Sequence, residues 1–147
     1  MSRSIIPNTI TCCNLICGCI ATGAAFEGGY LTAFVFILLG AAFDFFDGLV
    51  ARSLGVSGKF GVQLDSLADV VTFGVAPSAM LFSLFTQVYY PEFMYSKFWF
   101  TVMPFTAFLV AAFSACRLAK FNIDERQSEN FLGLATPACA MICGSFA

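Results

Sequence analysis

Four aspartates lie within or beside long apolar segments, where a carboxylate is costly. Asp44 and Asp47 sit near the end of one such segment, and Asp65 and Asp69 lie at the start of the next. An aspartate at the centre of a membrane helix costs at least about 2.5 kcal/mol. Residues three or four apart share one helix face, so each pair converges on a common partner. The segment between the pairs reverses the chain, and this can bring them face to face.

The chemistry available to four clustered carboxylates is the binding of divalent cations. Without cations between them, four such charges in one pocket would repel each other strongly. Carboxylate oxygens are hard ligands that suit Mg²⁺ or Mn²⁺, including two ions that share bridging carboxylates. Ca²⁺ fits the same ligand type. The sequence therefore predicts a metal site formed by Asp44, Asp47, Asp65 and Asp69.

The residues between the two pairs are suited to a diphosphate. Gly48 and Gly61 allow a ligand to approach the backbone closely, and Ala51 keeps the helix surface low. Arg52 can contact a phosphate through two N–H groups. Phosphoryl transfer depends mostly on positioning and charge neutralisation, which these groups and bound metal ions supply.

Structural explanations exist for single members of this set. One aspartate alone could cap a helix, as Asp65 could at the start of a span, or lie at the membrane interface. That explanation is much weaker for four aspartates together with an arginine. Gly18, Gly40 and Gly74 are equally well explained as packing points between membrane helices.

The composition indicates a membrane protein without histidine chemistry. Of 147 residues, 59% are hydrophobic and 11% are charged, and the mean hydropathy is +0.86. Soluble domains have about a quarter of their residues charged. The absence of histidine excludes Ser-His and Cys-His nucleophile pairs, so a general base must be a carboxylate or a perturbed Lys, Tyr or Cys. No basic run suggests binding to nucleic acid.

Cysteines are numerous, but their pattern indicates packing. No Cys-x-x-Cys pair and no histidine accompanies them, and cysteine is a common small residue in apolar interiors. We expect neither disulfides nor a cysteine metal site from the seven cysteines, which are Cys12, Cys13, Cys17, Cys19, Cys116, Cys139 and Cys143.

Apolar segments of membrane-spanning length predict an all-α, polytopic transmembrane helix bundle. A helical span needs about 20 residues. The predicted spans are 5–25, 30–50, 64–88 and 98–119, followed by a fifth segment from Phe131 to Ala147. We assign residues 1–147 to one membrane domain. Because the last segment lacks a flanking charge, we expect the chain to be part of a longer protein with further spans.

Loop charges predict the orientation of the bundle. If the spans alternate, the opposite side carries Lys97 with Glu27 and Glu92. The positive-inside rule then places the N-terminus and the aspartates on the cytoplasmic side of a bacterial inner membrane or its equivalent. The basic residues on that side are Arg3, Arg52, Lys59, Arg117, Lys120 and Arg126.

The aspartate pattern resembles the signature of the CDP-alcohol phosphotransferases. The matching pattern is Asp44-x2-Asp47-Gly48-x2-Ala51-Arg52-x8-Gly61-x3-Asp65-x3-Asp69, with eight fixed residues across 26 positions. The resemblance implies a bundle of six or more membrane helices, with a polar active site that faces the cytoplasm. It also implies two divalent ions on the four aspartates, Asp69 as the base for the acceptor hydroxyl, and a CDP site lined by Gly48, Ala51, Arg52 and Gly61.

Looser motifs resemble the phosphatidylserine synthases of this superfamily. They include Pro7-Asn8-x2-Thr11-x2-Asn14, Phe73–Pro77 and Arg117–Asn122. This resemblance implies transfer of a phosphatidyl group from CDP-diacylglycerol to L-serine, with release of CMP, in phospholipid biosynthesis. It also implies that Asn8 and Thr11 border the nucleotide. For Asn14 a polar contact between helices is equally plausible.

Two basic residues at the end of the fourth span are candidates for binding the acceptor or the lipid phosphate. Arg117 can grip the carboxylate of serine in two places, and Lys120 lies close in sequence. The alternative is that both only mark the cytoplasmic end of the span, where they touch lipid headgroups.

Two other functions remain open from the sequence. A sibling enzyme could use glycerol phosphate or inositol phosphate as acceptor, although the few basic residues near the site favour a smaller alcohol. A divalent-cation channel or transporter would also place aspartates in the membrane, but it would gain nothing from the diphosphate cradle. A homodimer is compatible with the sequence, which does not specify the oligomeric state, the preferred metal or the acyl chains.

Overall fold

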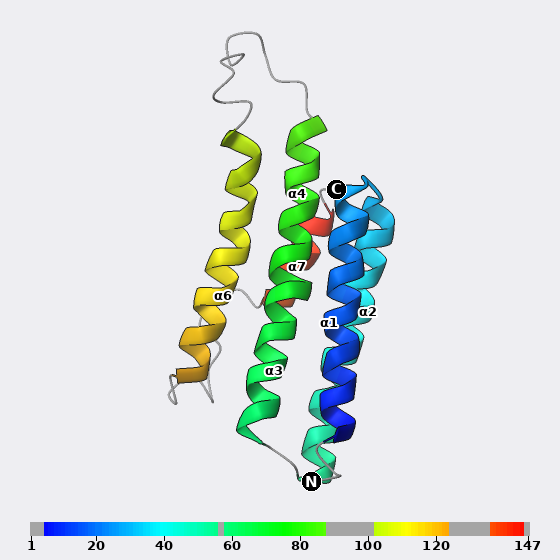
Figure 1. The fold of residues 1–147 in the computed structure, drawn as a ribbon, viewed down its shortest axis with the longest axis vertical. Helices are drawn as coiled ribbons and strands as arrows, with labels where there is room; N and C mark the ends of the chain where they lie inside the picture. The colour runs from blue at the N-terminus through cyan, green and yellow to red at the C-terminus, as the bar shows by residue number, and fades with distance from the viewer. Residues whose placement is uncertain (1–4, 56–57, 88–101, 124–135, 146–147) are drawn as a thin grey trace.

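The chain forms a bundle of helices that run along one long axis (Figure 1). The computed structural model describes residues 5–55, 58–87, 102–123 and 136–145. Four helical stretches are long and apolar enough to cross a membrane: Ile5–Phe26, Tyr30–Leu54, Phe60–Gln87 and Met103–Lys120. The prediction of an all-α membrane bundle is thereby confirmed. The α-helices are α1 (Ile5–Phe26), α2 (Tyr30–Leu54), α3 (Lys59–Asp69), α4 (Ala76–Gln87), α6 (Phe108–Ile123) and α7 (Thr136–Ser145).

The end of α2 and the start of α3 differ from the predicted limits. Helix α2 continues to Leu54, beyond the predicted end at residue 50, and stops at Gly55, whose φ of 61° is left-handed. Glycine adopts this conformation without steric cost, so it is a common helix terminator. Helix α3 begins at Lys59 rather than at residue 64. Helix α7 covers only part of the predicted fifth span, whose remaining residues lie outside the described part.

The third span contains a break in α-helical register directly after Asp69. A π-helical segment, Val70–Val75, joins α3 to α4. Two residues later Pro77 lacks an N–H group and its ring crowds the preceding turn, which disfavours a regular α-helix there. The Ser78 hydroxyl donates a hydrogen bond of 2.7 Å to the Gly74 carbonyl oxygen. Such π-helical turns are frequent at functional sites.

Small residues allow the helices to approach closely around this segment. A Cβ atom at Gly18 would lie 2.5 Å from the Thr72 hydroxyl oxygen, and one at Gly40 would lie 2.5 Å from the Thr72 methyl group. A Cβ at Gly74 would lie 3.4 Å from Ser114 of α6. The packing explanation for these glycines is confirmed. Alanines dominate the core cluster: Ala21, Ala25, Ala33, Ile37, Phe73, Ala76, Ala79, Met80 and Ala140.

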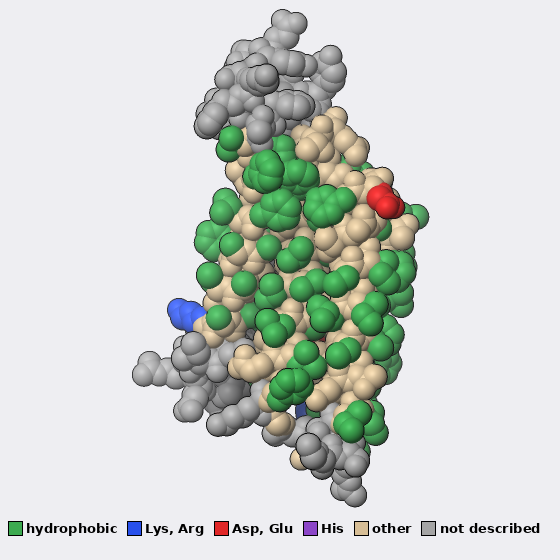
Figure 2. All heavy atoms as spheres, viewed as in Figure 1, with side chains coloured by type: hydrophobic (Ala, Val, Ile, Leu, Met, Phe, Trp, Pro, Cys, Tyr) green, Lys and Arg blue, Asp and Glu red, His purple; other side chains and the backbone are tan. Residues whose placement is uncertain are grey.

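The outer surface is apolar, as expected for a protein surrounded by lipid. Leu31 is 78% exposed, Phe113 is 71% exposed and Phe60 is 70% exposed. The face shown in Figure 2 is covered with hydrophobic side chains along most of its length. Such a surface would be unstable in water, whereas lipid tails cover it without cost.

Apart from the four aspartates and Arg117, the charged residues of the described part lie at or near the two ends of the bundle. The start of α1, the end of α2, the start of α3 and the end of α6 lie together at one end (Figure 1). Arg52 lies in the last turn of α2, and Lys120 lies in the last turns of α6. Glu27 follows α1 at the opposite end. Arg3, Glu92, Lys97 and Arg126 lie outside the described residues.

The described cysteines differ in exposure. Cys17 and Cys143 are buried, while Cys12, Cys19 and Cys116 are exposed and Cys13 is intermediate. The side chain of Cys139 lies outside the described part. Cys12, Cys13, Cys17, Cys19 and Cys116 are free thiols, as the sequence predicted.

Candidate metal and nucleotide site

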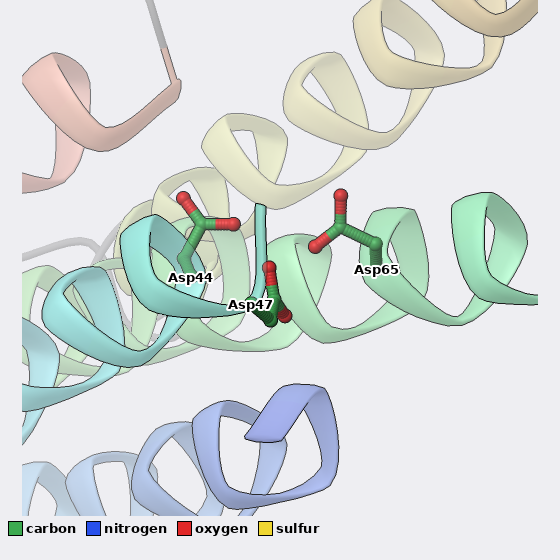
Figure 3. A group of neighbouring side chains, drawn as sticks. All are labelled: Asp44, Asp47 and Asp65. Carbon is green, nitrogen blue, oxygen red and sulfur yellow. The ribbon is translucent and has the colours of Figure 1, made fainter. Parts of the chain in front are cut away.

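Three aspartates from two helices form one compact group. Asp44 and Asp47 come from α2 and Asp65 comes from α3, and one oxygen from each lies within 4.8 Å of the others. The carboxylates of Asp44 and Asp65 face each other across the gap between the helices, with Asp47 between them (Figure 3). The i, i+3 spacing on α2 places both of its aspartates on the face that meets α3.

Asp69 completes the set one turn further along α3. Its carboxylate lies next to that of Asp44. Its Oδ1 accepts a hydrogen bond of 3.4 Å from the side-chain amide of Asn14. The structure therefore brings together all four aspartates that the sequence singled out.

One carboxylate oxygen in the group is both buried and unpaired. The Oδ1 atom of Asp65 has no hydrogen-bond partner within the described ranges. Buried polar atoms are almost always paired, so an exception calls for an explanation such as a bound ion. A set of hard carboxylate oxygens with one oxygen free is suited to a divalent cation.

Helix α1 supplies the hydrogen-bond donors that hold two of the aspartates. The Thr11 hydroxyl lies 2.5 Å from Oδ2 of Asp47, and the amide of Asn14 reaches Asp69. Both donors are buried, as is Asp47, which is 6% exposed. They belong to a buried face of α1 that repeats every three or four residues: Pro7, Thr11, Asn14, Gly18, Ala21 and Ala25.

A cavity of about 230 Å³ opens beside the aspartates. Asp47 and Asp65 line it, so a ligand there would lie against the carboxylates of the aspartate group. Five of the six residues predicted to bind the nucleotide also line it, namely Asn8, Thr11, Gly48, Ala51 and Gly61. The other lining residues were not predicted to bind the nucleotide; they are Pro7, Gly58, Phe60 and Val62.

Gly61 shows why a residue without a side chain is needed at this wall. A Cβ atom at this position would lie 3.3 Å from Oδ1 of Asn8, a tight contact. The glycine therefore lets α3 approach α1 while the cavity between them stays open.

Three predicted basic contacts lie outside the lining of this cavity. Arg52 is exposed, and its Nε–H donates a hydrogen bond of 3.0 Å to the Gly48 carbonyl oxygen. Arg117 is half-buried and Lys120 is exposed, both near the end of α6. Their roles toward phosphate and acceptor stay predictions.

One polar residue of the site could not be found from the sequence. Thr72 lies in the π-helical segment, is fully buried, and donates a hydrogen bond of 2.8 Å to the Asn14 side chain. A single threonine in an apolar run carries no signal of such a contact. Phe60, which is 70% exposed at the cavity, was also missed because aromatic residues abound in the chain.

The comparisons with known proteins agree with this geometry. Residues 4–146 match the family described as CDP-alcohol phosphatidyltransferase. The chain is 38% identical over 140 residues to the CDP-diacylglycerol–serine O-phosphatidyltransferase of Bacillus subtilis, covering 92% of this chain and 71% of that protein. It is 34% identical over 141 residues to the enzyme of the same name from Methanocaldococcus jannaschii, covering 96% of this chain and 59% of that protein.

An archaeal relative with another name is also similar. The chain is 30% identical over 144 residues to the archaetidylserine synthase of Methanothermobacter thermautotrophicus, covering 96% of this chain and 57% of that protein. The chain thus spans little more than half the length of several of its relatives. No solved structure shows significant similarity to it.

Proposed function

The chain belongs to the CDP-alcohol phosphatidyltransferase family, and we propose that it transfers a phosphatidyl group from CDP-diacylglycerol to the hydroxyl of L-serine. The products are phosphatidylserine and CMP. The reaction would serve phospholipid biosynthesis, with the lipid tails of the donor in the bilayer and its headgroup at the aspartates.

The observation that carries this proposal is the convergence of the aspartates beside the cavity. Carboxylates from α2 and α3 meet within 4.8 Å, and two of them also line the cavity. A metal-binding group next to a space walled by small residues is what a nucleoside diphosphate requires. A cation path through the membrane would need the aspartates but not this adjoining space, so the transport alternative is not favoured.

The names of the relatives favour serine as the acceptor. The names of relatives from Bacillus subtilis, Methanocaldococcus jannaschii and Methanothermobacter thermautotrophicus all refer to serine, although one of them is named for an archaeal lipid. The donor lipid therefore varies among these relatives while the named acceptor stays the same. Glycerol phosphate and inositol phosphate are not favoured.

The donor set of the site fits divalent metal ions. Asp44, Asp47, Asp65 and Asp69 would hold them, and the Oδ1 atom of Asp65, which has no hydrogen-bond partner in the described part, would be one of the ligand atoms. We propose two Mg²⁺ or Mn²⁺ ions, because four carboxylates offer more oxygens than one small ion uses. When bound, the ions neutralise the charge of the diphosphate and of the departing CMP.

Asp69 is proposed as the general base. Its carboxylate would take the proton from the serine hydroxyl while the hydroxyl oxygen attacks the phosphorus that carries the diacylglycerol. The bond between that phosphorus and the bridging oxygen breaks, and CMP leaves with the electron pair. Asn8, Thr11, Gly48, Ala51 and Gly61 would hold the CMP portion in the cavity.

The basic residues would bind the anionic groups of the two substrates. We propose that Arg52 turns from Gly48 toward a phosphate, because its side chain is exposed and it follows Asp47 on the same helix. Arg117 and Lys120 are proposed to hold the serine carboxylate or the lipid phosphate.

The basic end of the bundle is proposed to face the cytoplasm. CMP release and serine binding would then take place on that side of a bacterial inner membrane or its equivalent. Residues 1–147 would form one catalytic membrane domain. A homodimer stays a prediction.

The test is CMP release by full-length protein in detergent with CDP-diacylglycerol and Mn²⁺ or Mg²⁺. Serine, glycerol 3-phosphate, inositol phosphate or no acceptor is added in parallel. We expect release that depends on serine, disappears with a chelator and is lost in Asp69→Asn. Release driven by another alcohol would refute serine. No release with any acceptor, from folded protein that binds Mn²⁺, would refute the enzyme and favour transport.

A further inference from the structure

A buried chain of three polar residues connects Asp69 to the π-helical segment. The Thr72 hydroxyl lies 2.8 Å from Oδ1 of Asn14 and 3.1 Å from the Asn14 backbone oxygen. The Asn14 amide nitrogen lies 3.4 Å from Oδ1 of Asp69. Asn14 and Thr72 are both fully buried, and neither lines the cavity. Their contacts are therefore directed at Asp69 and not at a ligand.

The hydroxyl of Thr72 fixes which way the Asn14 amide points. A hydroxyl donates one hydrogen, and the shorter contact gives it to Oδ1 of Asn14. The NH₂ group is then turned toward Asp69. The reversed amide would set two oxygens, Oδ1 of Asn14 and Oδ1 of Asp69, against each other, which is unfavourable for a carboxylate. Thr72 thus favours the amide orientation in which Asp69 receives a donor.

Helices α1 and α2 pack closely around the side chains of Asn14 and Thr72. A Cβ atom at Gly40 of α2 would lie 2.8 Å from Oδ1 of Asn14 and 2.5 Å from the Thr72 methyl group. A Cβ at Gly18 of α1 would lie 2.5 Å from the Thr72 hydroxyl oxygen. Thr72 is therefore packed closely between α1 and α2, which restricts the movement of the pair. The π-helical segment begins directly after Asp69 and therefore sets where Thr72 stands relative to it.

We propose that Asn14 and Thr72 are positioning residues that hold the Asp69 carboxylate in the orientation needed for proton removal. The inference rests on the proposed function, because it assumes that Asp69 acts on the acceptor. Thr72 acts only through Asn14, and Asn14 acts only through Asp69. Neither residue contacts the substrates.

If Thr72 acts through Asn14 and Asn14 acts through Asp69, the single and double variants should differ in a specific way. Thr72→Val removes the hydroxyl at nearly constant volume, and we expect it to lower kcat about tenfold, with KM for CDP-diacylglycerol within twofold of wild type. Thr72→Ser keeps the hydroxyl and should retain most of the activity. Asn14→Leu should lower kcat at least as far as Thr72→Val. The double variant should be no worse than Asn14→Leu, since residues in one network are not additive.

A second measurement does not depend on turnover. In full-length protein labelled with ¹⁵N-asparagine, the Asn14 side-chain amide signal is identified by its absence in Asn14→Leu. We expect it to shift in Thr72→Val and to stay in place in Thr22→Val, a matched control whose hydroxyl bonds only the Gly18 carbonyl oxygen at 2.8 Å. If Thr72→Val does not fold, Thr72→Ala provides the same comparison.

Either of two results would overturn the proposal. One is an amide signal that does not move in Thr72→Val or Thr72→Ala. The other is a double variant whose loss equals the product of the single losses. Wild-type protein without serine-dependent CMP release would refute the proposed function separately, because the amide signal is measured without substrate.

Discussion

Thr11 and Asp47 form the shortest side-chain contact within the site. The hydroxyl of Thr11 points at Oδ2 of Asp47 from 2.5 Å, and both residues are buried. A hydroxyl that donates to one carboxylate oxygen leaves the other oxygen to face the site. Hydrogen bonds of this kind orient metal ligands and are costly to lose.

We expect Thr11→Val to weaken metal binding more than it slows the reaction at saturating metal. The apparent affinity for Mn²⁺ should fall about 10- to 100-fold, the usual cost of losing a partner of a metal ligand. The measurement is CMP release as a function of Mn²⁺ concentration. Thr11→Ser keeps the hydroxyl and serves as the matched control. A Mn²⁺ dependence unchanged in Thr11→Val would contradict a role for the Asp47 contact.

Gly61 gives a prediction about the cavity wall. An alanine there would place its Cβ atom 3.3 Å from Oδ1 of Asn8, so Asn8, which also lines the cavity, would have to move by a few tenths of an ångström. Because overpacking costs about 1–3 kcal/mol, we expect Gly61→Ala to raise KM for CDP-diacylglycerol roughly three- to tenfold. Steady-state kinetics at fixed serine would measure it. A raised KM for serine alone would place the acceptor, rather than the nucleotide, at this wall.

The sequence identified the residues that carry charge and singled out Thr11 and Asn14, which contact two of them, but it missed Thr72. Four aspartates in apolar segments stand out because lipid makes them costly, and their spacing already places each pair on one helix face. Thr72 and Phe60 are ordinary residues for a membrane helix, so only their neighbours in space distinguish them. The location of Arg52 also required the structure, since its side chain turns back to the Gly48 carbonyl oxygen.

Helix α1 contacts both helices that carry the aspartates and holds two of the aspartates in place. Its buried face carries hydrogen-bond donors near one end and small residues along the rest. The donors hold Asp47 of α2 and Asp69 of α3, while Gly18 admits Thr72. The two helices that provide the aspartates are therefore aligned through a third helix that provides none of them.

Close packing around Thr72 predicts a large difference between two glycine substitutions. Gly40→Ala would place a Cβ atom 2.5 Å from the Thr72 methyl group, whereas a Cβ at Gly23 of α1 would meet nothing within 4 Å. We expect Gly40→Ala to lower the melting temperature in detergent by several degrees, from an overpacking cost of about 1–3 kcal/mol, and to reduce activity. Gly23→Ala should be neutral or slightly stabilising. Equal melting temperatures for the two variants would contradict the packing.

The sequence predicted which segments form membrane helices, but it did not predict where α3 begins or that a π-helical turn follows it. Apolar length predicted the spans well, because lipid demands uninterrupted hydrogen-bonded backbone. The start of α3 was predicted too late, since its first turns include polar residues that lower the average hydropathy. The π-helical turn at Val70–Val75 was missed because one inserted residue barely disturbs an apolar run. Because that turn determines where Thr72 lies, its contact with Asn14 could not be predicted either.

At the scale of the whole molecule, the site lies toward the end of the bundle that carries the basic residues. Asp47 and Arg52 lie on the last turns of α2, and Asp65 lies near the start of α3. Glu27 marks the opposite end. A headgroup enzyme needs its polar site near one membrane surface, where water-soluble acceptors arrive and CMP leaves.

This arrangement predicts which ends can be labelled from each side of the membrane. In a cysteine-free background, Glu27→Cys should react with a membrane-impermeant maleimide on intact cells, because the non-basic end is expected to face outward. Ser53→Cys, exposed near the end of α2, should react only after the membrane is opened. The background is feasible because none of the described cysteines lines the cavity. Labelling of Ser53→Cys on intact cells, with Glu27→Cys protected, would invert the orientation and place the proposed active site outside.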